Sequence, residues 1–201
     1  MNISDIVDIT LVYIIKEPFE SLLVVLSLCT LFLDTKERIA ARILTFPKVL
    51  LYIYVYTHKH LYAKVIYSIV YGIVNIYGYY KWKEKPTTPH LTISRTPIKM
   101  LAAFIGVGTI STMLFGKVLA STLPNAQLPY WDSFNMVFGF IEKWLLMNKK
   151  LERWPIGIVR VIIYAITLYH VGAIMLCVLH IIQAILGMYG YITWRKSYLS
   201  N

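Results

Sequence analysis

The chain has 201 residues, of which 58% are hydrophobic and 15% are charged, and its formal net charge is +10. The mean hydropathy of +0.61 is too high for an ordinary soluble domain and predicts a polytopic membrane protein. The basic residues follow apolar runs instead of forming one basic face. We therefore expect them to contact the lipid bilayer and its anionic headgroups, and we expect no nucleic-acid partner.

The first 17 residues mix Asp5, Asp8 and Lys16 with apolar residues. This pattern predicts a short interfacial helix at 1–17 that lies on the membrane surface. Because the start of a cleavable signal peptide is basic, the two aspartates also argue against one.

Seven apolar runs follow, and a helix that crosses a bilayer needs about 20 residues. We expect spans at 19–33, 43–57, 61–81, 99–120, 133–147, 155–169 and 171–194. The second and sixth spans begin beside Pro47 and Pro155, and proline is tolerated at the start of a helix.

Two of the predicted helical hairpins resemble each other. Both begin with an aromatic residue and a proline, and both end with Tyr-Gly-Tyr followed by a tryptophan. The matching positions are 46–47 and 154–155, 77–79 and 189–191, and Trp82 and Trp194. An aromatic belt at the membrane surface would explain the aromatic residues alone, but it would not explain the repeat of the whole hairpin.

The repeat predicts an all-α fold with seven transmembrane helices, arranged as three helices, one linking helix and three more helices. A single linking helix gives both triplets the same orientation, and such parallel repeats commonly bind a solute between their halves near the bilayer midplane. The predicted parts are an interfacial segment at 1–17, a first three-helix repeat at 18–82, a cytoplasmic loop at 83–98, a linking helix at 99–120, an external loop at 121–131 and a second three-helix repeat at 132–197.

Lysine and arginine are concentrated after the first, third, fifth and seventh predicted spans and are sparse between the others. Loops rich in these residues stay in the cytoplasm. The pattern therefore predicts an external N-terminus and a cytoplasmic C-terminus.

Short motifs in a fixed order run from about residue 18 to about residue 197. They are Glu20, Leu61-Tyr62-Ala63, the segment from Asn75 to Trp82, the segment from Pro129 to Ser133, Lys149 with Glu152 and Trp154, and Gly190 with Trp194. In this order they resemble the PnuC family of bacterial vitamin B transporters, whose triplet repeat is similar to that of the sugar-carrying SWEET proteins. The resemblance implies a homotrimer in the bacterial inner membrane that takes up nicotinamide riboside, or else thiamine or another B vitamin. It also implies that a separate cytoplasmic kinase traps the vitamin.

Nicotinamide riboside and thiamine are aromatic cations, so a binding site for them needs π-faces and a few hydrogen bonds at the edge of the ring. The aromatic candidates are Tyr79, Trp82, Trp144 and Trp154, and the polar candidate is Asn75 in the third span. An amide in hydrocarbon must find a partner, so we expect Asn75 to face the bundle interior. There it would bind the substrate or form an interhelical hydrogen bond.

Five further residues have two interpretations each. His180 and Gln183, one turn apart in the last span, would contact the substrate or bond to each other. Asp132 would attract cations to the outer mouth or cap the fifth span. Lys143 and Arg160 would gate the path or extend to the membrane surface, and an inward Arg160 would favour an anionic or neutral guest.

This chain differs from the family at several positions where the family commonly has a polar or aromatic residue that contacts the ligand. At these positions this chain has Lys48, Ser68, Lys143, Gly157 and Val161. They leave the exact vitamin open and raise a second hypothesis, a membrane interaction protein that transports nothing. The sequence has no phosphate-binding loop, no metal-binding motif and no paired carboxylates deep in a span. We therefore expect no enzyme activity, no cofactor and no metal, and we expect facilitated diffusion by alternating access.

Overall fold

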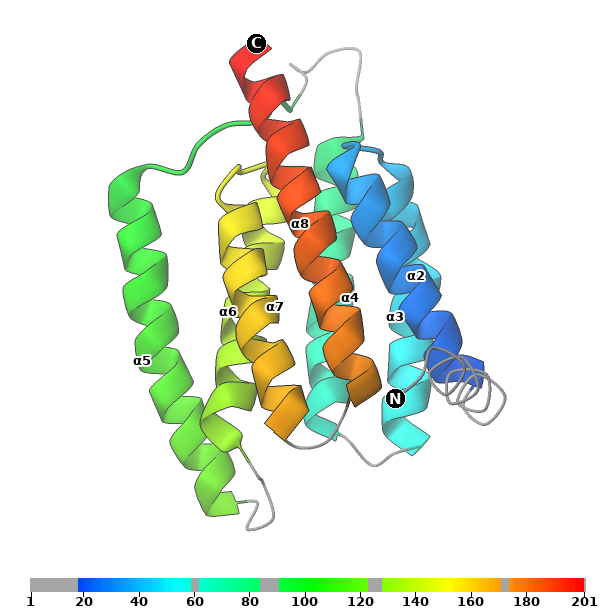
Figure 1. The fold of residues 1–201 in the computed structure, drawn as a ribbon, viewed down its shortest axis with the longest axis vertical. Helices are drawn as coiled ribbons and strands as arrows, with labels where there is room; N and C mark the ends of the chain where they lie inside the picture. Colours follow the sequence, from blue (N-terminus) through cyan, green and yellow to red (C-terminus); the bar gives the residue numbers. More distant parts are fainter. Residues whose placement is uncertain (1–17, 59–61, 84–90, 123–127, 171–173, 201) are drawn as a thin grey trace, which may run out of the picture.

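The computed structural model describes residues 18–58, 62–83, 91–122, 128–170 and 174–200 as a bundle of helices (Figure 1). These helices are α2 (Pro18–Thr35), α3 (Ala40–His58), α4 (Tyr62–Trp82), α5 (Ile98–Thr122), α6 (Pro129–Met147), α7 (Arg153–His170) and α8 (Ile174–Ser200). The interfacial helix predicted at 1–17 lies outside the described residues, as do 84–90 and 123–127 of the two predicted loops.

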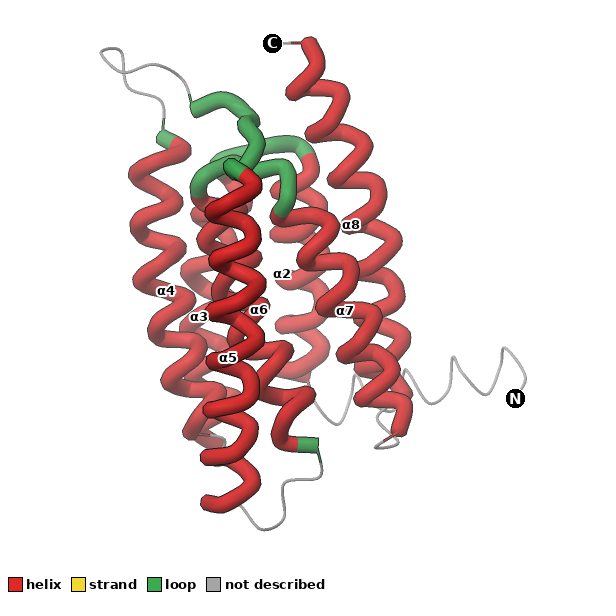
Figure 2. The backbone as a smooth tube through the Cα atoms, turned by 90° about the vertical axis from the view of Figure 1, so that its left-hand side faces the viewer, coloured by secondary structure: helices red, strands yellow, loops and turns green. Residues whose placement is uncertain are grey.

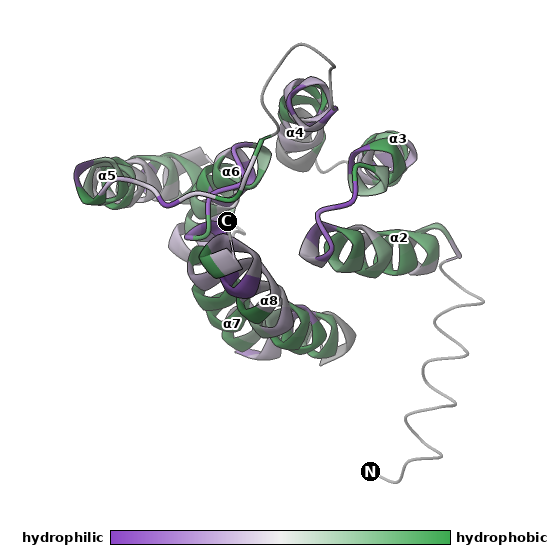
Figure 3. Cartoon of the chain, turned by 90° about the horizontal axis from the view of Figure 1, so that it is seen from above, coloured by the Kyte–Doolittle hydropathy of each residue, from purple (hydrophilic) through white to green (hydrophobic). Residues whose placement is uncertain are grey.

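The helices run along one common direction, as the two side views show (Figures 1 and 2). Seen from one end, α2, α3 and α4 form one group and α6, α7 and α8 form another (Figure 3). We call these groups the first unit and the second unit. The units meet where α2 packs on α8 and where α4 packs on α6, whereas α5 packs only on α6 among the described helices.

Each predicted span corresponds to one helix, but some boundaries differ. The prediction that Pro47 stands at a helix start is wrong, because α3 begins at Ala40 and Pro47 lies inside it. The basic residues at the start of α3 resembled a loop, yet Ala41 and Arg42 are buried helical residues. Pro155 does lie in the first turn of its helix, since α7 begins at Arg153.

The burial pattern is the reverse of that in a soluble protein. Large apolar side chains such as Leu50, Ile98 and Ile110 are more than 60% exposed, whereas Arg42 and Asn75 are fully buried. Polar groups buried among helices with an apolar outer surface are typical of a membrane bundle. By length and mean hydropathy alone, only α5 and the segment Cys177–Ser200 of α8 qualify as membrane-crossing helices within the described residues.

One end of the bundle holds a compact aromatic core, near the C-terminus in Figure 1. We call it the tryptophan end; its buried residues are Trp82, Ile93, Leu146, Met147, Leu151, Trp154 and Trp194. The segment before α5 is attached there by backbone hydrogen bonds. Ser94 donates to the carbonyl of Lys149 at 3.1 Å and accepts from Leu151 at 3.0 Å.

Candidate functional site

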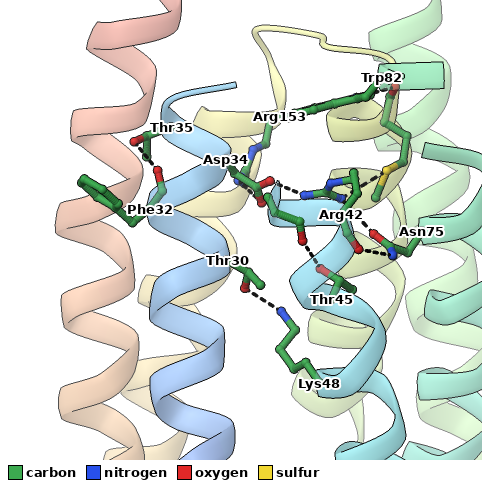
Figure 4. Close-up of polar contacts among 12 residues, drawn as sticks. Thr30, Phe32, Asp34, Thr35, Arg42, Thr45, Lys48, Asn75, Trp82 and Arg153 are labelled. Atoms are coloured by element: carbon green, nitrogen blue, oxygen red, sulfur yellow. Dashed lines mark hydrogen bonds and ion pairs between the residues drawn. The ribbon is translucent and has the colours of Figure 1, made fainter. Parts of the chain in front are cut away.

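A buried ion pair joins the first two helices of the first unit. Arg42, in the first turn of α3, pairs with Asp34 near the end of α2 (Figure 4), and the two side chains are 0% and 5% exposed. The same guanidinium donates to Asn75 Oδ1 at 3.4 Å and lies 5.0 Å from the ring centre of Trp82. It also donates to Met147 Sδ of α6 at 3.3 Å. Arg42 of α3 is therefore held by three other helices and neutralised by one carboxylate.

A second carboxylate, Glu142 of α6, pairs with two arginines of α7. Arg153 Nη1 lies 2.9 Å from Glu142 Oε1, and Arg160 Nη2 lies 2.8 Å from Oε2. Arg160 also donates to Asn135 Oδ1 at 2.5 Å. Glu142 therefore does not extend to the surface, and the inward placement of Arg160 is balanced by a carboxylate.

The two ion pairs are connected across the units. Arg153 Nη2 lies 3.8 Å from Asp34 Oδ2, so the second unit reaches the carboxylate of the first. A Cβ on Gly157 would lie 3.0 Å from the Glu142 carboxyl carbon, so the glycine leaves room for this carboxylate. Removing one member of such a buried network is costly, because the remaining charge has no water to solvate it.

Two lysines from different units approach one tyrosine. Lys48 Nζ of α3 lies 5.6 Å from the ring centre of Tyr71, and Lys143 Nζ of α6 lies 5.1 Å from it. Lys48 is only 6% exposed and donates to Thr30 Oγ1 at 2.8 Å (Figure 4). Lys48 lies within the second predicted span, and its side chain is buried inside the bundle.

Two indole groups link the units in a reciprocal way. Trp82, the last residue of α4, donates to the carbonyl of Met147 at the end of α6, at 3.1 Å. Trp194 of α8 donates to the carbonyl of Asp34 near the end of α2, at 3.0 Å. In each case the third helix of one unit binds the end of the first helix of the other unit.

The turns after α2 and α6 also meet. Glu37 and Lys149 have positive φ angles of 52° and 47°, a conformation that few residues other than glycine adopt. Lys149 Nζ lies 2.9 Å from Glu37 Oε2, which adds an ion pair between the units. The tryptophan end is therefore closed by indole hydrogen bonds, an ion pair and apolar packing.

The structure brings three of the predicted binding residues to this closed end. Asn75 is fully buried and donates to the carbonyl of Arg42 at 2.9 Å, which makes it an interhelical hydrogen-bonding residue. Trp82 packs 6.3 Å from Trp194 between ring centres. Trp154 is 1% exposed and stands edge-on to Trp194 at 5.5 Å.

The remaining predicted residues lie apart from this cluster, and two of them, His180 and Asp132, share Tyr164 as a neighbour. Tyr79 contacts Phe46 of α3, Trp144 contacts Phe104 of α5 and is 39% exposed, and His180 contacts Tyr164 of α7. Gln183 is half-buried on α8, and Asp132 is exposed in the first turn of α6, hydrogen-bonded to Tyr164.

An open apolar groove of about 420 Å³ lies between α7 and α8. Its lining consists of Ile162, Ala165, Ile166, Tyr169, Cys177, Ile181, Ala184, Ile185 and Met188. None of the predicted binding residues contributes to it, and its apolar lining suits a lipid chain.

Five residues of the buried network were not predicted as site residues: Asp34, Arg42, Glu142, Arg153 and Tyr71. A signal for the ion pairs is present in the sequence. In each unit a carboxylate on the first helix precedes an arginine at the start of the second helix, by 8 residues for Asp34 and Arg42 and by 11 for Glu142 and Arg153. No signal marks Tyr71 among the 16 tyrosines of the chain.

The sequence model of one protein family, described as nicotinamide mononucleotide transporter, matches residues 17–196. The chain belongs to this family. It is 23% identical over 194 residues to the nicotinamide riboside transporters PnuC of Escherichia coli (strain K12) and of Shigella flexneri, which covers 82% of this chain and 80% of each relative. The crystal structure of the vitamin B3 transporter PnuC has the same fold, with a TM-score of 0.66 at 21% identity, covering 94% of this chain and 86% of that one.

Family membership makes the chain a membrane-embedded, multi-pass protein. It accounts for the buried polar network, because polar groups in hydrocarbon must be satisfied inside the bundle. It also accounts for the apolar outer surface of the helices, which faces lipid instead of water.

We expect Asn75→Leu to destabilise the protein by about 1–3 kcal/mol, because the carbonyl and guanidinium of Arg42 each lose a buried partner. Thermal unfolding of the purified protein, followed by tryptophan fluorescence, measures this change. Ile76→Leu is the control, since Ile76 is 46% exposed on the same helix. Unchanged stability with loss of ligand binding would instead assign Asn75 to the substrate.

Proposed function

We propose that the protein is a carrier, not an enzyme, for a ring-shaped vitamin, with nicotinamide riboside as the first candidate and thiamine as the second. Membership of the nicotinamide mononucleotide transporter family is the observation that carries this proposal. The curated relatives are nicotinamide riboside transporters, and the ring compounds they are named for suit a bundle rich in aromatic residues.

In the proposed mechanism the two units form a parallel repeat joined by α5 and rock against each other. The reciprocal indole bonds of Trp82 and Trp194 support this view, because equivalent groups in two like-oriented units should make equivalent contacts. The closed tryptophan end is then one of the two gates. Opening it would break both indole bonds and the pair of Glu37 with Lys149.

The direction and energetics of transport are part of the same proposal. The basic loops favour a bacterial inner membrane location with the tryptophan end in the cytoplasm. We propose a homotrimer, with a separate path in each protomer, that works by facilitated diffusion, with a kinase trapping the vitamin after entry. Within the described residues the buried carboxylates Asp34 and Glu142 are paired with arginines, which does not favour a proton-coupled step.

Uptake of radiolabelled nicotinamide riboside and thiamine into liposomes that contain the purified protein tests the proposal. We expect saturable uptake of at least one compound that stops when the internal and external concentrations are equal. Absence of flux of every vitamin tested would favour the second candidate, a membrane interaction protein. That candidate is motivated by the residues Lys48, Ser68, Lys143, Gly157 and Val161, which differ from common family contacts.

A further inference from the structure

The buried network carries more positive than negative charge. Its carboxylates are Asp34 and Glu142, and its cations are Arg42, Arg153, Arg160, Lys48 and Lys143. The three arginines take up both carboxylates. Among the described side chains, neither lysine has a carboxylate oxygen within ion-pair distance, although the charge of Lys143 does act on the nearby Glu142.

The hydrogen bonding of these lysines is also incomplete. An ammonium group has three N–H donors, and Lys48 uses one of them on the hydroxyl of Thr30 at 2.8 Å. Its other described contact is the face of Tyr71, which Lys143 also approaches. Using only one of three donors is costly for a side chain that is 6% exposed in a medium that excludes water.

The two ammonium groups also share one neighbour. Both lie within 6 Å of the ring centre of Tyr71, so the nitrogens are no farther apart than the two distances combined, 5.6 and 5.1 Å. Like charges within this bound repel each other in a medium of low dielectric constant. Since Lys48 belongs to the first unit and Lys143 to the second, this repulsion acts between the units.

A negatively charged group between the lysines would relieve both costs. It would accept hydrogen bonds from the free ammonium donors, and charge-assisted hydrogen bonds of this kind are the stronger ones. It would also draw the two units together. A cationic ring such as nicotinamide riboside or thiamine would instead add a third positive charge.

We propose that Lys48 and Lys143 form an anion-binding site between the two units, and that the guest of this carrier bears a carboxylate or a phosphate. The inference rests on the proposed carrier function and changes the expected order of substrates. If the preferred anion is a phosphate, phosphorylation by a kinase cannot be the step that traps the guest. The ring of Tyr71 holds the two lysines at a common depth, where closure of the units around the anion completes the site.

Three ring compounds that differ in one charged group test the charge of the guest. They are nicotinamide riboside, nicotinamide mononucleotide, which adds a phosphate, and nicotinic acid riboside, which replaces the amide with a carboxylate. Their dissociation constants are measured by calorimetry on the full-length protein in nanodiscs. We expect at least one anionic compound to bind about tenfold or more tightly than nicotinamide riboside, and which one does so identifies the anion.

Lys48→Gln and Lys143→Gln test the residues. Each substitution keeps a side chain that can hydrogen-bond but removes the charge. We expect each to weaken binding of the preferred anionic compound about tenfold or more, and to leave nicotinamide riboside binding unchanged or tighter. Lys117→Gln is the matched control, because Lys117 is an exposed lysine on α5. Equal affinities for nicotinamide riboside and for the two compounds that carry an anionic group, or equal losses for all compounds in the variants, would overturn the site.

A second readout separates this site from the carrier function. This readout is the rise in the unfolding temperature of the purified protein when inorganic phosphate or nicotinate is added. It reports binding of the anion and does not depend on transport of a vitamin. Stabilisation that Lys48→Gln abolishes would support the anion site even if no vitamin crossed the membrane. Vitamin transport without such stabilisation, and without an anionic preference, would support the carrier and overturn the anion site.

Discussion

Glu142→Gln should lower the free energy of unfolding by about 3–5 kcal/mol, the usual cost of leaving a buried charge without its partner. The carboxylate of Glu142 holds Arg153 at 2.9 Å and Arg160 at 2.8 Å, and its side chain is 5% exposed. Glutamine has the same shape but no charge, so Arg160 would lose its ion pair and Arg153 would keep only the longer one with Asp34, at 3.8 Å. Thermal unfolding of the purified protein in detergent, followed by tryptophan fluorescence, measures the change.

Glu152→Gln is the matched control for this experiment. Glu152 pairs with Arg95 at 3.4 Å, and the arginine side chain is 64% exposed. Glutamine can still accept the hydrogen bond from the Thr96 amide, now made to Glu152 Oε2 at 2.8 Å. We expect a loss of no more than about 1 kcal/mol, as for other exposed ion pairs. Equal losses in the two variants would mean that the Glu142 network contributes no more than a surface pair.

The second large effect is expected for Gly190→Ala. A Cβ at this position would lie 2.2–2.5 Å from three ring carbons of Trp154. The indole is 1% exposed and packed against Trp194, so it cannot move aside easily. Overpacking of this kind typically costs about 1–3 kcal/mol, and we expect the upper part of that range because the obstacle is a rigid ring.

Gly106→Ala on α5 gives the contrasting result, because a Cβ at Gly106 has no neighbour within 4 Å. There we expect alanine to be neutral or to stabilise the helix by about 0.5–1 kcal/mol. The double variant Gly190→Ala with Trp154→Leu should recover part of the stability that Gly190→Ala loses. If Gly190→Ala were as stable as Gly106→Ala, the close packing of Trp154 would not hold in solution.

The helices themselves are predictable from hydropathy, because runs of apolar residues are separated by charged or proline-rich segments. The starts of α3 and α7 are less predictable, since Arg42 and Arg153 resemble loop residues until their partners are known. Those partners, Asp34 and Glu142, lie 8 and 11 positions away on a preceding helix. A single-residue scale cannot represent such a pair, so each arginine is scored as an unpaired charge.

The candidate site was predictable only in part, because the sequence shows single unusual residues but not the contacts between helices. Asn75 and Trp82 stand out because polar and indole groups in an apolar span need hydrogen-bonding partners, and the structure supplies both partners. Tyr71 does not stand out, because its importance arises only from the two lysines that approach it from different helices. Trp144 has the same residue type as Trp82 but faces α5, a difference that depends on helix packing alone.

The reciprocal indole bonds have a further consequence for how such a protein assembles. When two surfaces exchange the same contacts, the interface has the self-complementary form that a two-fold axis creates between identical chains. Trp82 with Met147, and Trp194 with Asp34, follow that form within one polypeptide. In the sequence α5 lies between the two units, so one polypeptide joins two groups of helices that also hold each other by matching contacts.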